Sequence, residues 1–255
     1  MNHRRRSPRA RSQRGGTWRT ALLLATGAAA TTAIGFALGW AWLLPFLGAA
    51  VPYPLFLRRV ARKRYAAAVG WVLLWALFQS VAVSLAVAWA PERAAEVVHS
   101  GPKYSAEMLN WVRTGEGAEG SPRLFLPIHL RHYVGLCALS VVTAGSAALV
   151  LGTWLLNYMS YYVTDLVRAS AHPITATLLG WPVWSIIRVA GFVVTGAALT
   201  GFSLSLYNRL RKRTRAVRFP ARVFLIGLAL VVLDAALKAA LAPLWQRTLL
   251  RALGE

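Results

Sequence analysis

ALLLATGAAATTAIGFALGWAWLLPFLGAAVPYPLFL, residues 21–57, runs for 37 consecutive positions without Asp, Glu, Lys or Arg. Two more stretches lack these charged residues, at 66–90 and 133–164. A helix rises about 1.5 Å per residue and needs roughly 20 apolar residues to cross the ~30 Å hydrocarbon core of a bilayer. Because a helix satisfies its own backbone polar groups, these runs predict an all-α integral membrane protein.

The composition agrees with this prediction. The 255 residues are 57% hydrophobic and 15% charged, whereas a soluble domain carries about 25% charged residues. Apolar runs of this length exclude a membrane β-barrel, whose strands alternate polar and apolar residues over ~10 positions. The only cysteine, Cys137, excludes an intramolecular disulfide and disfavours a cysteine-based metal site.

The order of apolar runs and breaks predicts a helical bundle of about six transmembrane helices, or five if 21–57 crosses once. Gly39–Trp42 and Pro45 predict a turn within that stretch, with the tryptophans at a membrane interface. We therefore expect one helix before the turn and another after it. The six expected helices span residues 20–39, 42–57, 66–90, 133–160, 182–207 and 220–243.

These helices divide the chain into four segments. Residues 1–19 are rich in arginine and are expected to form a disordered cytoplasmic tail, and 20–90 holds the first three membrane helices. Residues 91–132 carry five of the eight acidic residues and five basic ones, so we expect this neutral, polar segment on the extracytoplasmic side. Residues 133–255 hold the last three membrane helices and a short C-terminal tail.

The basic residues give a net charge of +21 and gather in three clusters, within 1–19, 58–64 and 209–222. Basic clusters beside membrane helices normally stay in the cytoplasm. Six crossings place the first two clusters in the cytoplasm and leave 209–222 outside. Five crossings move 58–64 outside instead, so neither number satisfies all three clusters.

The basic residues also indicate a location and partners. Arginine outnumbers lysine 25 to 4, a skew typical of a GC-rich genome, so we expect a bacterial inner-membrane protein with a cytoplasmic N-terminus. Anionic lipid headgroups are the expected partners of the basic clusters. Small residues spaced by four suit packing within the chain and are also compatible with a homo- or hetero-oligomer. No basic and aromatic platform for nucleic acid is present, and no motif for a cofactor.

Asp234 and Lys238 are the most informative charged residues. They lie four positions apart within an apolar helix and so share one face. A charge at the bilayer centre costs roughly 2.5–3.5 kcal/mol, which is why such residues are normally paired inside a bundle. Two interpretations stay open: a pair that neutralises itself and locks the helix, or part of a relay or polar binding site. Arg188 is expected to pair with Asp165 or Asp234, or to reach the headgroups.

Four other residues complete the candidate set. Asp165 is expected on an interfacial turn, paired with Arg168, and Asn157 precedes it on a polar and aromatic face. His129 and His132 are three positions apart and are weak candidates for metal ligands, since no third ligand is evident. Zinc-protease, hydrolase and phosphate-loop motifs are missing from the sequence.

These features predict a multi-pass membrane protein with one of two functions. The first is a non-catalytic scaffold or assembly component, with the segment 91–132 and the basic clusters as its contact surfaces. The second is a small transporter or channel component, with Asp234, Lys238, Arg188, Asp165 and Asn157 along a polar path. An enzyme is disfavoured, because no nucleophile and base stand in a recognisable arrangement.

Overall fold

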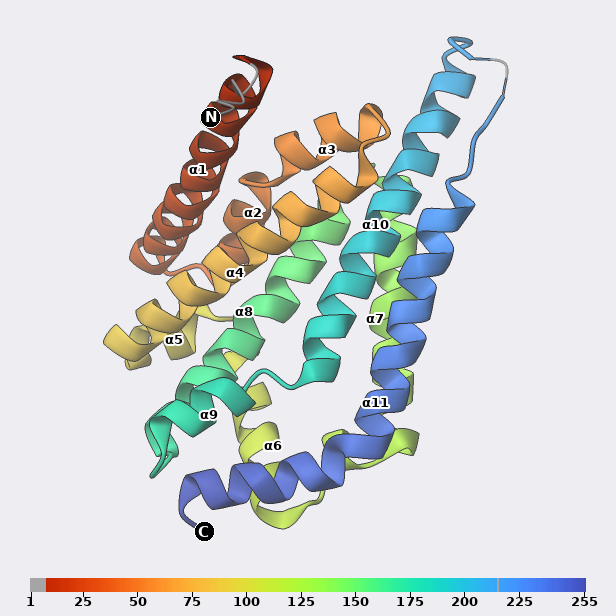
Figure 1. Cartoon of the computed structure of the whole chain (residues 1–255). Coiled ribbons are helices and arrows are strands. Elements are labelled where there is room, and N and C mark those ends of the chain that lie inside the picture. The colour runs from red at the N-terminus through yellow and green to blue at the C-terminus, as the bar shows by residue number, and fades with distance from the viewer. Residues whose placement is uncertain (1–7, 215) are drawn as a thin grey trace, which may run out of the picture.

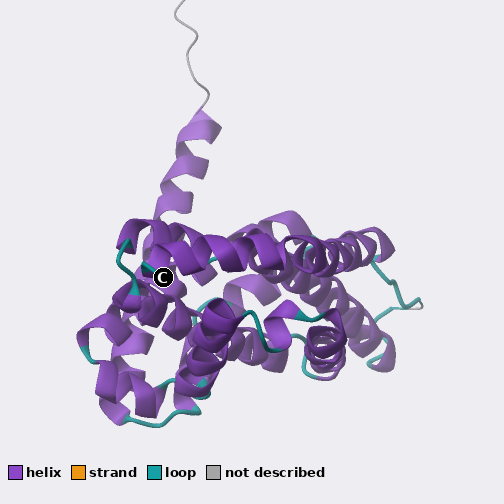
Figure 2. Cartoon of the chain, turned by 90° about the horizontal axis from the view of Figure 1, so that it is seen from below, coloured by secondary structure: helices purple, strands orange, loops and turns teal. Residues whose placement is uncertain are grey.

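The computed structural model describes residues 8–214 and 216–255, with side chains from residue 17 onward. Throughout these residues the chain is helical and has no strand (Figures 1 and 2). The helices are α1 (Pro8–Leu38), α2 (Leu43–Ala50), α3 (Tyr53–Ala61), α4 (Tyr65–Trp89), α5 (Pro91–Val97), α6 (Gly101–Thr114), η1 (Ala118–Gly120), α7 (Pro122–Val142), α8 (Ser146–Ala169), α9 (Pro173–Leu179), α10 (Val183–Leu210) and α11 (Ala221–Leu253).

Five helical stretches within the described residues are long and apolar enough to cross a membrane. They are Thr17–Leu38, Tyr65–Trp89, Pro122–Val142, Pro173–Leu210 and Ala221–Leu253. This agrees with the expected all-α membrane protein. The expected disordered tail at 1–19 lies partly outside the described residues, and from Pro8 onward the chain is helical.

The first apolar stretch folds back on itself, as its sequence predicts. Gly39 makes the turn with a φ of +76°, a conformation that costs glycine little. After the turn, Leu44 packs beside Gly35 and Val51 beside Gly27, so α2 runs antiparallel to α1. The expected single helix 42–57 is instead two helices, because Pro52 lacks the N–H that would continue α2.

The expected helix 133–160 is wrong, and this changes the topology. A turn at Thr143–Gly145 divides it into α7 and α8, which run antiparallel and pack against each other (Figure 1). Ala144 and Gly145 have φ values of +50° and +86°. The hydroxyl of Thr143 accepts a hydrogen bond from the N–H of Ala147 at 3.0 Å and so satisfies one backbone donor in the first turn of α8. α7 also begins at Pro122, inside the segment expected to be polar.

Helix α8 lies at the centre of the molecule. It packs against α2, α4, α6, α7 and α9, and it buries polar residues that include Thr153, Asn157 and Ser160. A helix surrounded by protein needs no apolar outer surface. With 24 residues α8 is long enough to cross a membrane. Its buried polar residues explain why it is not among the five stretches that are apolar enough to qualify as spans.

The loops gather at two opposite ends of the bundle (Figure 1). One end, here called the basic end, holds the start of α1, Arg58–Arg64, the turn 143–145 and the linker between α10 and α11. Ser203 donates a hydrogen bond to the carbonyl of Val141 at 2.6 Å, which fixes α10 beside the turn. The other end holds α9 and the segment 90–121, here called the cap, which comprises α5, α6 and η1.

Helix α11 continues past Pro243, where the sequence predicted its end. It bends there and runs beneath the bundle to Leu253 (Figure 1). Proline removes one backbone hydrogen bond and kinks a helix without ending it when other contacts hold the continuation. Two such contacts exist: Trp245 donates to the carbonyl of Leu179 at 2.9 Å, and Gln246 donates to that of Val112 at 2.6 Å.

Candidate functional site

Arg188 and Asp234 form an ion pair through two hydrogen bonds, which no other ion pair of the described residues does. The Nε of Arg188 donates to one carboxylate oxygen of Asp234 at 2.8 Å, and its Nη2 donates to the other at 3.0 Å. The side chain of Asp234 is 2% exposed and that of Arg188 is 21% exposed. α10 and α11 pack closely along their length, which brings these two side chains together. Of the two carboxylates expected as partners for Arg188, the structure pairs it with Asp234 and not with Asp165.

Lys238 pairs with the cap and not with Asp234. Its Nζ lies 2.6 Å from a carboxylate oxygen of Glu119 in η1 and 4.5 Å from the centre of the Phe125 ring. The Lys238 side chain is fully buried, and Glu119 is 19% exposed. The expected pairing of Asp234 with Lys238 within one helix is thus wrong. Each residue uses its charge to hold a different element against α11.

These four residues, Glu119, Arg188, Asp234 and Lys238, are here called the ionic cluster. The cluster contains two cations and two anions and is neutral as a whole. An unpaired charge in a protein interior costs several kcal/mol, and a good ion pair with further polar contacts offsets that cost. The cluster therefore joins α10 and the cap to α11 at the capped half of the bundle.

Tyrosines extend the polar region from the ionic cluster towards α8. The ring of Tyr104 in α6 lies 4.5 Å from that of Tyr158, and its hydroxyl donates to the sulfur of Met159 at 3.6 Å. Burial, with a smaller contribution from the Glu119 carboxylate, raises the pKa of Tyr104 well above its ordinary value. The phenol therefore stays protonated and remains a hydrogen-bond donor.

His129 and His132 both face this polar region from α7. His129 lies beside Phe125, with ring centres 5.1 Å apart, and its Nδ1 is buried without a hydrogen-bond partner. His132 stands edge-on to Trp154 at 6.3 Å. Within the described residues no group of three His, Cys, Asp or Glu side chains is placed to hold a metal ion.

Asp165 and Asn157 lie away from the ionic cluster. Asp165 accepts a hydrogen bond from Ser105 at 2.8 Å, which joins α8 to the cap, and it does not pair with Arg168 as expected. Asn157 accepts one from Gln79 of α4 at 3.3 Å. Of the five residues expected along one polar path, three gather near α11 and two serve separate contacts between helices.

Two residues of this region were missed by the sequence prediction, Glu119 and Tyr104. Glu119 belongs to a Gly- and Ser-rich link, and no periodic pattern shows which acid of that link folds back onto the bundle. Tyr104 lies on an amphipathic helix whose buried face also contains Met108 and Trp111. The helical spacing of the apolar residues in α6 could have predicted that Tyr104 faces the bundle. It could not have predicted that Tyr158 is its neighbour.

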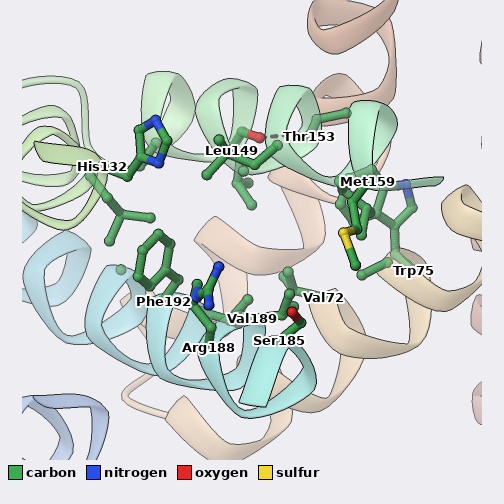
Figure 3. Close-up of a pocket in the computed structure, with 18 of the residues that line it drawn as sticks. Val72, Trp75, His132, Leu149, Thr153, Met159, Ser185, Arg188, Val189 and Phe192 are labelled. Atoms are coloured by element: carbon green, nitrogen blue, oxygen red, sulfur yellow. Dashed lines mark hydrogen bonds between the residues drawn. The ribbon is translucent and has the colours of Figure 1, made fainter. Parts of the chain in front are cut away.

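A cavity of about 130 Å³ lies between α8 and α10, which contact each other only sparsely (Figure 3). α4 and α7 complete its walls. Its lining is mainly apolar, as Leu149, Val189 and Phe192 illustrate, and Arg188 rises from α10 into the space facing α8 (Figure 3). The cavity thus adjoins the ionic cluster through Arg188.

Comparison with known proteins provides no family for this chain, since no protein-family model, curated protein or solved structure matches it.

Proposed function

We propose that this chain is a non-catalytic scaffold of a bacterial inner membrane, which presents its cap as a fixed surface outside the cytoplasm. The observation that carries this proposal is that buried polar contacts bind the cap to the bundle at several points. Glu119 pairs with Lys238, Ser105 donates to Asp165, and Trp154 of α8 donates to the carbonyl of His99 at 3.2 Å. Because this surface is already ordered, its binding to a partner carries little further cost in conformational entropy.

The topology in this proposal has seven crossings: α1, α2 with α3, α4, α7, α8, α10 and α11. The sequence predicted six crossings. The division of 133–160 into α7 and α8 adds a seventh. Arg58–Arg64 and the basic linker between α10 and α11 then share one side, in keeping with the positive-inside rule. We assign that side to the cytoplasm, where the basic end would contact anionic headgroups.

The acidic residues support the same assignment. Every Asp and Glu of the chain belongs to α5, α6, the link to α7, α8, α11 or the C-terminus, and none belongs to the basic end. The cap has both signs of charge, while the basic end has one. The exposed face of α6 is polar and includes Lys103, Glu107 and Asn110, which is a composition suited to a protein partner outside the bilayer.

A transport role is the second candidate, and the cavity beside Arg188 is the observation that favours it. Against it, the charges of the ionic cluster are engaged in fixed pairs, and the cavity lining is mainly apolar. A path for an ion or a proton requires exchangeable polar groups along its length.

Photo-crosslinking in cells tests the scaffold. A crosslinking side chain at Glu107, on the exposed face of α6, is expected to trap one defined protein, whereas the same group at the exposed Leu77 of α4 is expected to trap lipid only. The purified protein in liposomes should conduct no ions or protons above the level of empty liposomes. Flux that disappears in the variant R188L/D234L would establish transport in place of the scaffold.

A further inference from the structure

An open groove lies between α1 and α4 near the basic end. Both helices start at that end, and they pack against each other (Figure 1). The groove has a volume of about 590 Å³, and no charged side chain lines it. Its walls include Trp18 and Ala21 of α1, and Ala67, Gly70, Trp71 and Leu74 of α4. An apolar groove of this size lies within the range of ~300–1,000 Å³ that is usual for ligand pockets.

The groove is as deep as the upper part of one membrane leaflet. From Ala67 to Leu74 the helix α4 rises roughly 10 Å, at 1.5 Å per residue. One leaflet contributes about half of a hydrocarbon core of ~30 Å. At Gly70 an added Cβ would meet no atom within 4 Å, so the missing side chain widens the groove. The first part of an acyl chain therefore fits between the helices, and its end stays in the bilayer.

Two tryptophans line the groove from opposite walls, Trp18 from α1 and Trp71 from α4. The side chain of Trp18 is exposed and that of Trp71 is half-buried. Tryptophan settles at the level of the lipid headgroups, where the ring is in contact with apolar chains and the indole N–H donates to a polar oxygen. Both rings thus suit the glycerol ester region of a phospholipid.

Arginines stand beside the groove on each helix. The guanidinium of Arg19 lies 5.6 Å from the centre of the Trp18 ring, which keeps this cation beside the groove. Arg64 is exposed and precedes Ala67 by three residues, about one helical turn. Within the described residues neither arginine forms an ion pair. This separates the groove from the ionic cluster, in which every cation already has its anion.

We infer that the groove binds one anionic glycerophospholipid of the phosphatidylglycerol class. Its phosphate lies between Arg19 and Arg64, and one acyl chain runs along Gly70 and Trp71. Charge complementarity selects this occupant, because unpaired cations attract a lipid with a net negative charge. A second copy of the chain would bring the same cations to the groove and be repelled. The site rests on the proposed placement of the basic end at the headgroups, and it names the lipid that this end holds.

Native mass spectrometry of the purified full chain, titrated with single lipids in detergent, tests the inference. We expect one tightly bound phosphatidylglycerol per chain. Phosphatidylcholine should bind about tenfold more weakly, because its headgroup has no net charge. Glycerol phosphate, which has the anion without acyl chains, should not displace the lipid. Equal affinity for the two lipids would overturn the role of the arginines, and displacement by glycerol phosphate would overturn the role of the groove.

A charge substitution locates the headgroup. The variant R19Q/R64Q should lower phosphatidylglycerol affinity by about tenfold and abolish the preference over phosphatidylcholine. The variant R213Q/R218Q is the matched control, since it removes the same charge from exposed positions at the same end of the bundle. Its affinity should equal that of the wild type. Equal weakening in the two folded variants would show a diffuse attraction and overturn the site.

A substitution at Gly70 locates the acyl chain. Gly70→Leu fills the groove and should weaken both lipids by about tenfold, whereas Ala88→Leu, at an exposed position of α4 at the other end, should weaken neither. Unchanged binding in folded Gly70→Leu would overturn the groove, as would a wild-type dimer that this variant abolishes. Lipid binding that persists when the crosslink at Glu107 fails would refute the scaffold alone. The crosslink without selective lipid binding would refute this site alone.

Discussion

Arg188 of α10 holds both carboxylate oxygens of Asp234 of α11, at 2.8 and 3.0 Å, from a position 46 residues earlier in the chain. A two-point contact between planar groups fixes the rotation of each helix as well as their separation. Asp234 therefore has its partner on a neighbouring helix, although Lys238 lies only one turn away on its own helix. Helix packing decided this pairing.

The first prediction concerns this ion pair. Arg188→Leu leaves the carboxylate of Asp234 buried without a partner, so we expect a loss of about 3–5 kcal/mol in the free energy of unfolding. The double variant R188L/D234L removes both charges and should recover most of that loss. Thermal unfolding in detergent measures both variants. A single variant as stable as the wild type would show that Asp234 has another partner.

The second prediction concerns the attachment of the cap. Glu119→Gln removes the anion that neutralises Lys238, so η1 should separate from α11 more often. Hydrogen exchange at residues 118–121 should accelerate by about tenfold, which corresponds to ~1.4 kcal/mol. Glu116→Gln is the control, because Glu116 is exposed and lies three residues earlier. Equal exchange in the two variants would exclude the Lys238 pair as a support of the cap.

The third prediction concerns the turn between α7 and α8. Gly145 has a φ of +86°, and a Cβ there would collide with the side chain of Thr200. Gly145→Ala should therefore destabilise the protein by at least about 1–2 kcal/mol. Gly152→Ala, inside α8 with open space around it, should stabilise by about 0.5–1 kcal/mol. The amount of folded protein and its melting temperature should fall in Gly145→Ala and rise in Gly152→Ala. Equal effects would contradict the turn.

The fourth prediction concerns the side of each loop. In a Cys137→Ser background, single cysteines replacing Arg59, Ala144 and Arg213 should all be protected from a membrane-impermeant thiol reagent in intact cells. A cysteine replacing Glu107 on the cap should react. Reaction at Arg213 together with protection at Arg59 would restore six crossings and refute the seven proposed here.

The all-helical fold class and the turn at Gly39 could both be predicted from the sequence. Long runs without charged residues indicate helices, and a glycine beside a proline-containing stretch indicates a turn, so both features depend on local chemistry. The sequence did not predict the turn at 143–145. No charged or proline residue interrupts 133–164, and Ala144 fits a helix as well as a turn. At the site, the sequence identified Arg188 and Asp234 but not Glu119, because the approach of η1 to α11 depends on the path of the cap.

The polar interior of α8 has a consequence for how the chain is made. Thr153, Asn157 and Ser160 weaken the tendency of α8 to leave the translocon for lipid by itself. Its neighbours α2 and α4 are synthesised earlier, and Gln79 of α4 supplies the hydrogen bond to Asn157. We therefore expect the first half of the chain to serve as a template for inserting the second. Residues 122–255 produced alone should be degraded, and co-production with residues 1–121 should rescue them.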